Sequence, residues 1–133
     1  MEKLKQRLEL IVPIYDKEDD EIINSDLINS FTKNITEVCG GCNRTHGLGY
    51  WINDNKEQIE DINVYYEWYF NKDNYNDITT YLYCIISELI HIYNQEGVSI
   101  VLNNVLYIIN IKDLEDSNVI KDIFSGGIKD ENV

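Results

Sequence analysis

The 133-residue sequence contains no alanine, a single proline and few basic residues. Its 11 lysine and arginine residues face 24 aspartate and glutamate residues, which leaves a formal net charge of −13 at pH 7. Because phosphate groups repel such a chain, binding to duplex nucleic acid or to an anionic membrane is disfavoured. No apolar run approaches the roughly 20 residues of a membrane-spanning helix, and the first residues lack a secretory signal pattern.

The missing alanine has no physical basis, since alanine is the best helix former. Isoleucine and asparagine are abundant instead, which favours codon bias in an AT-rich genome. We therefore expect a low-GC bacterium as the source, or a phage or other mobile element living in one. The expected location is the cytoplasm of the host bacterium.

The three cysteines form one motif-like group, Cys39-Gly-Gly-Cys42, and a distant Cys84. His46 and His91 could add metal ligands, but a structural zinc site usually has two paired ligand clusters and one is present here. The pair also closes a predicted helix, whose negative end raises a thiol pKa and disfavours redox chemistry. We expect reduced cysteines and no cofactor, and the sequence leaves metal binding open.

Hydrophobic residues make up 44% of the chain, enough for one compact core. We expect a single domain over residues 1–125 and a flexible tail over residues 126–133. Residues 4–15 alternate between apolar and polar and predict a half-buried strand. After an acidic loop, Asn24 or Ser25 caps a helix that ends at Gly40-Gly41.

Residues 46–53 and 62–70 predict two further strands, and Asp77 caps a long helix that ends before Gly97. Residues 99–102 and 105–109 flank Asn103-Asn104, a pair typical of a type I′ hairpin turn. A short amphipathic helix follows, capped by Asp116 or Ser117. This order predicts an α+β fold of the ferredoxin-like βαββαβ type, with both main helices on one face of an antiparallel sheet.

A glycine-rich segment, residues 40–51, leads into the strand that contains Val64 to Phe70, and Gln95-Glu96-Gly97-Val98 precedes the later hairpin. These features resemble a family of small, functionally uncharacterised bacterial and phage α+β proteins with a Gly-Gly…Gly-x-Gly-x-Trp signature. The resemblance covers roughly residues 4–109. It implies the fold and supplies no catalytic residue.

Aromatic residues gather on the predicted hairpin. One parity of the strand, with Tyr66, Trp68 and Phe70, suits the core. The other parity exposes Tyr65 and Tyr69 on the open sheet face, beside Lys5 and Arg7 if the first strand is central. Such a face favours self-association as a homodimer or higher homo-oligomer, or binding of a small nucleotide-like ligand. The candidate ligand-binding residues are Arg44, at a phosphate, and Trp51, Tyr65 and Tyr69, by stacking.

No catalytic constellation is evident. His46 and His91 have no serine motif near them, and Glu88 with His91 is more often a solvated pair on a helix surface. A glycine-rich phosphate loop before a helix is also missing. We therefore expect a protein that is not an enzyme.

Two functions remain. The first is a phage or mobile-element protein that inhibits a host defence protein through its acidic surface, because clustered carboxylates fit a basic partner. The second is sequestration of a small nucleotide immune signal in an oligomeric aromatic pocket. The acidic residues expected to contact a partner protein are Asp16, Asp19, Asp20, Glu21, Glu57, Glu60 and Asp61.

Overall fold

A computed structural model describes residues 1–16, 18 and 21–131 of the chain. Three short 3-10 turns, at Ile22–Asn24, Lys72–Asn74 and Asp113–Glu115, accompany the main elements. These are β1 (Gln6–Pro13), α1 (Asp26–Cys39), β2 (Asn43–Ile52), β3 (Gln58–Phe70), α2 (Tyr75–His91), β4 (Val98–Leu102), β5 (Val105–Ile109) and α3 (Val119–Gly127).

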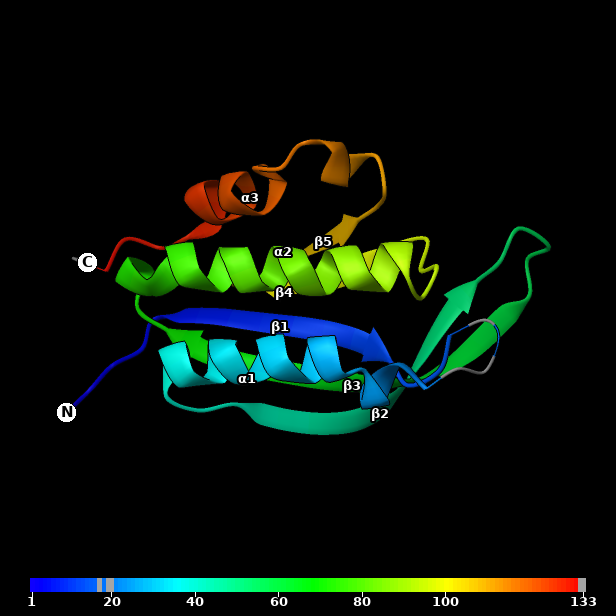
Figure 1. Ribbon diagram of the computed structural model, residues 1–133, viewed down its shortest axis with the longest axis horizontal. Helices are drawn as coiled ribbons and strands as arrows, with labels where there is room; N and C mark the ends of the chain where they lie inside the picture. Colours follow the sequence, from blue (N-terminus) through cyan, green and yellow to red (C-terminus); the bar gives the residue numbers. More distant parts are fainter. Residues whose placement is uncertain (17, 19–20, 132–133) are drawn as a thin grey trace.

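The five strands form one antiparallel sheet in the order β2-β3-β1-β4-β5. The predicted α+β class is therefore confirmed, and the arrangement fits a ferredoxin-like α+β fold with an additional strand and helix. Figure 1 shows α1 and α2 side by side over one face of the sheet, with α3 beside α2. The opposite face, here called the open face, has no described helix over it.

Local signals set the ends of the helices. The Ser25 side chain accepts a hydrogen bond from the backbone N–H of Ile28, as expected for the residue that caps α1. Gly40 ends α1 with a φ of 91°, a left-handed conformation that favours glycine. Asp77, in contrast, is not the cap of α2: the helix begins two residues earlier, at Tyr75, so Asp77 lies in its first turn. There its negative charge still favours the positive helix end.

The core is built from one parity of the three central strands. Leu8 and Leu10 of β1, Trp68 and Phe70 of β3 and Ile100 of β4 are fully buried under the helices. The prediction that one face of β3 supplies the core is confirmed. Since successive side chains of a strand alternate between faces, the same register places Tyr65, Glu67 and Tyr69 on the open face.

The indole of Trp68 is the largest buried side chain and carries a polar N–H. Its Nε1 donates a hydrogen bond to the hydroxyl of Thr36 on α1, at 3.0 Å. The same hydroxyl donates to the carbonyl of Thr32, at 2.9 Å. This one hydroxyl therefore satisfies a buried donor and fixes α1 over β3.

Asn103 and Asn104 join β4 to β5 with φ values of 49° and 71°. Positive φ at both positions confirms the predicted type I′ turn. The Asn103 amide donates to Gln6 at 2.8 Å and to the carbonyl of Gly127 at 2.9 Å. The turn therefore holds the start of β1 and the end of α3 together.

Residues 126–131 of the predicted flexible tail lie within the described part of the chain, and residues 132 and 133 lie outside it. α3 continues through Gly127, and the buried Gln6 exchanges two hydrogen bonds with the backbone of Lys129. The carboxylate of Glu131 accepts from Gln6 and from the backbone N–H of Lys72. Sequence reasoning could not predict these contacts, because the partners lie more than fifty residues away along the chain.

The distal half of the β2–β3 hairpin, residues 48–62, extends past the end of β1, because the pairing of β1 with β3 stops at Asn63. We call this segment the arm; it projects from the sheet in Figure 1. Leu48, Tyr50, Trp51 and Ile52 are exposed on it. In the described part of the chain, no helix combines the length and apolar character needed to cross a membrane.

The Trp68–Thr36 hydrogen bond predicts a specific loss of stability. Thr36→Val keeps the side-chain shape but leaves the indole N–H unsatisfied, which costs about 1–3 kcal/mol in the free energy of unfolding. Urea denaturation followed by circular dichroism measures this loss. Thr80→Val is the matched control, because Thr80 is exposed and bonds its own helix. Equal stability of both variants contradicts the assignment.

Candidate functional site

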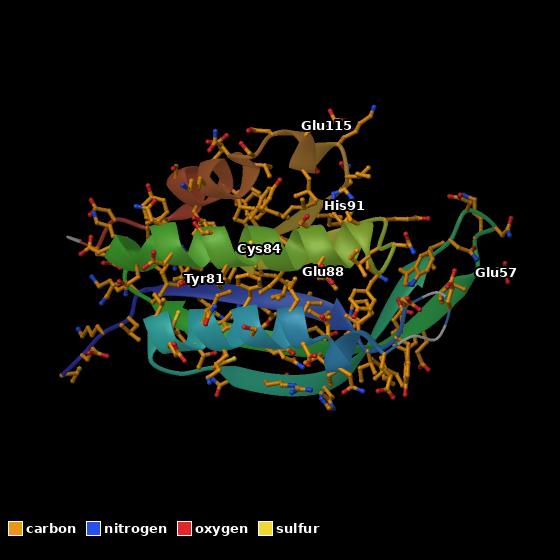
Figure 2. All side chains as sticks on the ribbon, in the orientation of Figure 1. Glu57, Tyr81, Cys84, Glu88, His91 and Glu115 are labelled. Carbon is orange, nitrogen blue, oxygen red and sulfur yellow. The ribbon has the colours of Figure 1, made fainter. Side chains whose placement is uncertain are left out.

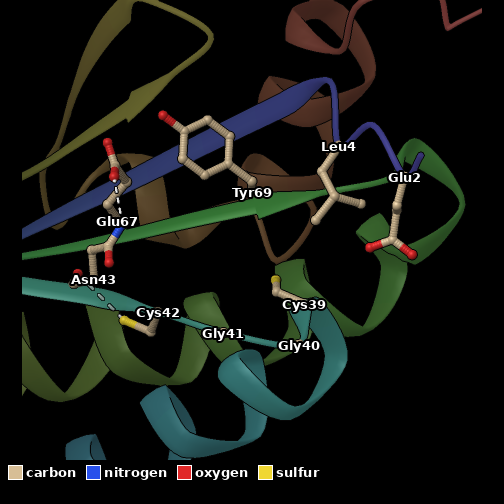
Figure 3. Close-up of a pocket in the computed structure, with 9 residues that line it drawn as sticks. All are labelled: Glu2, Leu4, Cys39, Gly40, Gly41, Cys42, Asn43, Glu67 and Tyr69. Atoms are coloured by element: carbon tan, nitrogen blue, oxygen red, sulfur yellow. Dashed lines mark hydrogen bonds between the residues drawn. The ribbon is translucent and has the colours of Figure 1, made fainter.

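Two shallow hollows lie on either side of the connection between α1 and β2. The first, of about 320 Å³, opens at the C-terminal end of α1 beside the open face. Figure 3 shows Asn43, Glu67 and Tyr69 on the sheet, while Cys39 and Cys42 lie next to the end of α1. We call it the Glu67 hollow.

Strand register assembles the polar centre of this hollow. β1 pairs Glu9 with Glu67, and β2 pairs Asn43 with Glu67, so one carboxylate has neighbours on both sides. The Arg7 guanidinium donates to Glu67 from Nε at 2.6 Å and to Glu9 from Nη2 at 2.7 Å. The Asn43 amide donates to the second Glu67 oxygen at 3.1 Å. Glu67 is therefore fixed in one orientation.

These contacts also fix the ionisation of the carboxylate. Hydrogen bonds from Arg7, first, and from Asn43 lower the pKa of Glu67 below its ordinary value, since they stabilise the charged form. Glu67 is thus ionised at neutral pH. The group of Arg7, Glu9 and Glu67 has one positive and two negative charges, and keeps a net charge of −1.

The cysteines of the hollow are thiols rather than thiolates. Burial raises the pKa of Cys39 to about 12, and burial also raises the pKa of Cys42. Neither is therefore an activated nucleophile at neutral pH. Among the residues that the structure describes, no group of three or more histidine, cysteine, aspartate or glutamate side chains could hold a metal ion.

The second hollow, of about 360 Å³, lies on the helix side of the same strands. The Arg44 guanidinium carbon lies 5.6 Å from the centre of the Tyr66 ring, a cation–π distance. Lys33 and Asn29 of α1 also line this hollow, as does Cys42, which the two hollows share. We call it the Arg44 hollow.

The four predicted ligand-binding residues do not meet in one site. Arg44 pairs with Tyr66 in the register and so faces the helices, whereas Tyr65 and Tyr69 face the other way. Trp51 lies on the arm, where its indole donates to Asp61 at 2.8 Å. The single-site prediction is corrected for a simple reason: adjacent strand residues point to opposite faces. Tyr69, which is 42% exposed, lines the Glu67 hollow.

The acidic residues predicted to contact a partner are divided between two places. Glu57, Glu60 and Asp61 lie on the arm, and Figure 2 shows Glu57 near its tip. Glu60 accepts from the Tyr50 hydroxyl at 2.7 Å, and Asp61 accepts from Trp51. Asp16 and Glu21 belong to the acidic segment between β1 and the turn that begins at Ile22. Asp19 and Asp20 of that segment lie outside the described residues.

The remaining candidate groups lie on α2. Figure 2 shows Cys84, Glu88 and His91 along one helix, α2. Within the described residues, Glu88 and His91 form no ion pair.

The sequence interpretation missed Glu67, Asn43 and Glu9. Their parity was readable, because Glu67 lies between Tyr65 and Tyr69 in an alternating strand. The sequence could not predict that these three side chains lie together, because their proximity depends on the register of three strands that are distant in sequence.

Comparisons with known proteins give a fold relation and no family. No family model and no curated protein matches the chain, so the proposed family resemblance stays a prediction. Two solved structures share the fold. A phage SAM lyase in complex with S-methyl-5′-thioadenosine has a TM-score of 0.58 at 12% identity, over 84% of this chain and 96% of the other. A phage SAM lyase in the apo state has a TM-score of 0.55 at 14% identity, over the same shares.

This likeness corrects the expectation that the chain is not an enzyme. Its fold is related to that of a lyase. The exclusion of catalysis relied on a missing nucleophile, metal cage and phosphate loop. Those absences exclude the mechanisms that need such groups and no others, since binding and orienting a reactive substrate is itself a catalytic contribution.

The lowered pKa of Glu67 predicts a pH-dependent contribution to stability. A carboxylate whose pKa falls on folding stabilises the native state above its unfolded pKa of about 4.3, and the contribution disappears as pH falls through the folded value. Glu67→Gln is expected to lower the free energy of unfolding at pH 7 by about 1 kcal/mol, with a smaller difference at about pH 3.

Urea denaturation at the two pH values measures the effect, and Glu115→Gln is the control, on an exposed residue of a 3-10 turn. If Glu67→Gln lowers the free energy of unfolding equally at both pH values, the negative charge of Glu67 does not stabilise the fold.

Proposed function

We propose that this protein binds a 5′-thioadenosine-type ligand in the Glu67 hollow and cleaves S-adenosylmethionine there. The observation that carries the proposal is the fold shared with a phage SAM lyase that was solved with S-methyl-5′-thioadenosine, over 96% of that chain. The chemistry of the hollow supports it independently. An ionised carboxylate, an amide and an exposed tyrosine are grouped at one opening.

Glu67 and Asn43 suit the ribose of such a ligand. The Glu67 oxygens accept from Arg7 and Asn43 and keep further lone pairs, since a carboxylate has about four acceptor positions. Two neighbouring ribose hydroxyls can donate to these positions. The Arg7 and Asn43 contacts hold the carboxylate in place before the ligand arrives, which lowers the entropic cost of binding.

Tyr69 suits the adenine. Its ring is exposed at the mouth of the hollow and lies on the same face as Glu67, two residues away along β3. A base that stacks on a tyrosine ring gains about 1–3 kcal/mol. Gly40 and Gly41 line the same opening and have no side chains there to narrow it.

The cleavage needs no nucleophile from the protein. S-adenosylmethionine is a sulfonium ion, and the thioadenosine product lacks its aminobutyrate chain. When the bond between sulfur and that chain breaks, sulfur takes the electron pair and becomes a neutral thioether. The carbon that loses sulfur is attacked in the same step by the carboxylate of the substrate itself. The new carbon–oxygen bond replaces the carbon–sulfur bond and closes a lactone, and no proton is released. The protein supplies binding and orientation.

The proposal predicts binding of S-methyl-5′-thioadenosine that depends on Tyr69. Isothermal titration calorimetry is expected to show saturable binding, and Tyr69→Ala is expected to weaken it by at least about tenfold through lost stacking. Tyr50→Ala, which removes an exposed tyrosine from the arm, is the control and leaves the affinity unchanged.

Incubation with S-adenosylmethionine, followed by mass spectrometry, measures cleavage directly. The thioadenosine product is expected to appear with enzyme and to be strongly reduced with Tyr69→Ala. Absence of binding to the thioadenosine overturns the proposal as a whole. Binding without any product overturns the lyase step and leaves ligand sequestration.

We further propose that the β4–β5 side of the open face, away from the Glu67 hollow, is covered by another copy of the chain. Ile108, 65% exposed, and Leu106 lie on this face beside Val101, and they continue the apolar surface toward Ile11 and Tyr65. An exposed apolar surface of this kind favours an interface between copies. The charge of −13 on each copy opposes association, so salt should strengthen it.

Light scattering coupled to size exclusion tests this association. The wild type is expected to have a mass at least twice 15.6 kDa at micromolar concentration, and Ile108→Lys is expected to shift it to a monomer. Ile92→Lys, on an equally exposed isoleucine at the end of α2, is the control. A monomeric wild type at low and high salt contradicts the proposal.

The role proposed for the whole protein is that of a phage protein acting in the host cytoplasm on a host metabolite. Depletion of a nucleotide-like substrate fits both the shared fold and the expected mobile-element source. Contact of the acidic arm with a basic host protein stays a prediction.

A further inference from the structure

The Arg44 hollow is lined by positively charged side chains, whereas the protein as a whole is strongly negative. In a chain with a net charge of −13, Arg44 and Lys33 line one opening together. Throughout residues 1–16, 18 and 21–131, neither side chain forms an ion pair. Glu37, one helical turn after Lys33, does not pair with it either. Two unpaired cations at one hollow are unexpected in so acidic a protein.

The position of each cation is fixed by its element. The Arg44 guanidinium lies over the face of Tyr66, and that ring is stacked on Trp68 with centroids 5.7 Å apart. Tyr66 is buried. Lys33 extends from α1, and Asn29, one turn earlier, lines the same hollow. A rigid aromatic base thus supports the guanidinium, whose N–H groups donate to no acceptor among the described residues.

We propose that the Arg44 hollow is a binding site for the phosphate group of a small molecule. A planar guanidinium donates two parallel hydrogen bonds to a phosphate, and an ammonium adds a point charge. Asn29 donates to the carbonyl of Ile23 at 3.0 Å, and its amide oxygen can accept from a ligand hydroxyl. Phosphate is favoured over a carboxylate because its two charges match both cations.

This site is separate from the proposed lyase site. Arg44 and Glu67 are on opposite faces of the sheet, and the Glu67 hollow holds net negative charge, which repels phosphate. Cys42 lines both hollows, and the Arg44 charge acts to lower the pKa of its thiol. A phosphate at Arg44 neutralises that charge, so the thiol provides an independent reporter of occupancy.

The test is an NMR titration of the ¹⁵N-labelled protein at constant ionic strength with inorganic phosphate, AMP and adenosine. Phosphate and AMP are expected to shift amides of residues 29–36 and 42–45 saturably, while adenosine leaves them unchanged. Saturation by phosphate alone assigns free phosphate, and tighter saturation by AMP assigns a nucleoside monophosphate.

Variants give the controls. Arg44→Gln and Lys33→Gln are expected to weaken phosphate binding by about tenfold each. Lys112→Gln changes the net charge equally at a distant exposed position and is expected to change nothing. Alkylation of Cys42, followed by mass spectrometry, should slow when phosphate is added to the wild type and remain unchanged in Arg44→Gln.

Three results overturn the proposal: shifts that do not saturate, equal weakening by Lys112→Gln, or equal effects of adenosine and AMP. Each variant is first checked for native amide dispersion. The conservative Arg44→Lys keeps the charge and the fold and is expected to retain part of the affinity, so loss of folding in Arg44→Gln does not remove the test.

Binding of S-methyl-5′-thioadenosine is expected to be unaffected by Lys33→Gln, which separates this site from the proposed function.

Discussion

The structure depends on the pairing register between β1 and β3. One parity of β3 places Val64, Tyr66, Trp68 and Phe70 under the helices, and the other places Tyr65, Glu67 and Tyr69 on the open face. A slip of one residue would exchange the two sets and bury a charge in place of the core. The ion pair between Arg7 and Glu67, at 2.6 Å, joins the two strands in this register.

Both hollows follow from that constraint. Adjacent residues of β2 and β3 point to opposite faces, so Asn43 and Glu67 form one opening, while Arg44 and Tyr66 form the other. The end of α1 at Gly40 allows the chain to pass between them. Two hollows of opposite charge are thereby separated by the thickness of a single sheet, and Cys42 lines both.

Much of the fold could be predicted from the sequence because its signals are local. Ser25, the alternation along β3 and the Asn103–Asn104 turn each specify their own element.

The candidate site could be predicted only in part. The exposure of Tyr69 follows from parity, but the contacts of Glu67 and of Gln6 join residues far apart in the chain. The error of merging Arg44 with Tyr65 and Tyr69 arose from grouping residues by sequence distance instead of by sheet face. The charge of −13 predicts weak binding to duplex nucleic acid, which stays a prediction. Arg44 was singled out from the sequence as a cation for a phosphate, whereas Lys33, its neighbour in the hollow, was not.

The central claim is that the thioadenosine ligand binds on the open face beside Glu67. Intermolecular NOEs between the adenine protons of S-methyl-5′-thioadenosine and assigned aromatic side chains test it most directly. We predict NOEs to the ring of Tyr69 and to the amide of Asn43, with none to Tyr66 on the opposite face. NOEs confined to Tyr66 and Arg44, or none to any aromatic ring, would contradict the claim.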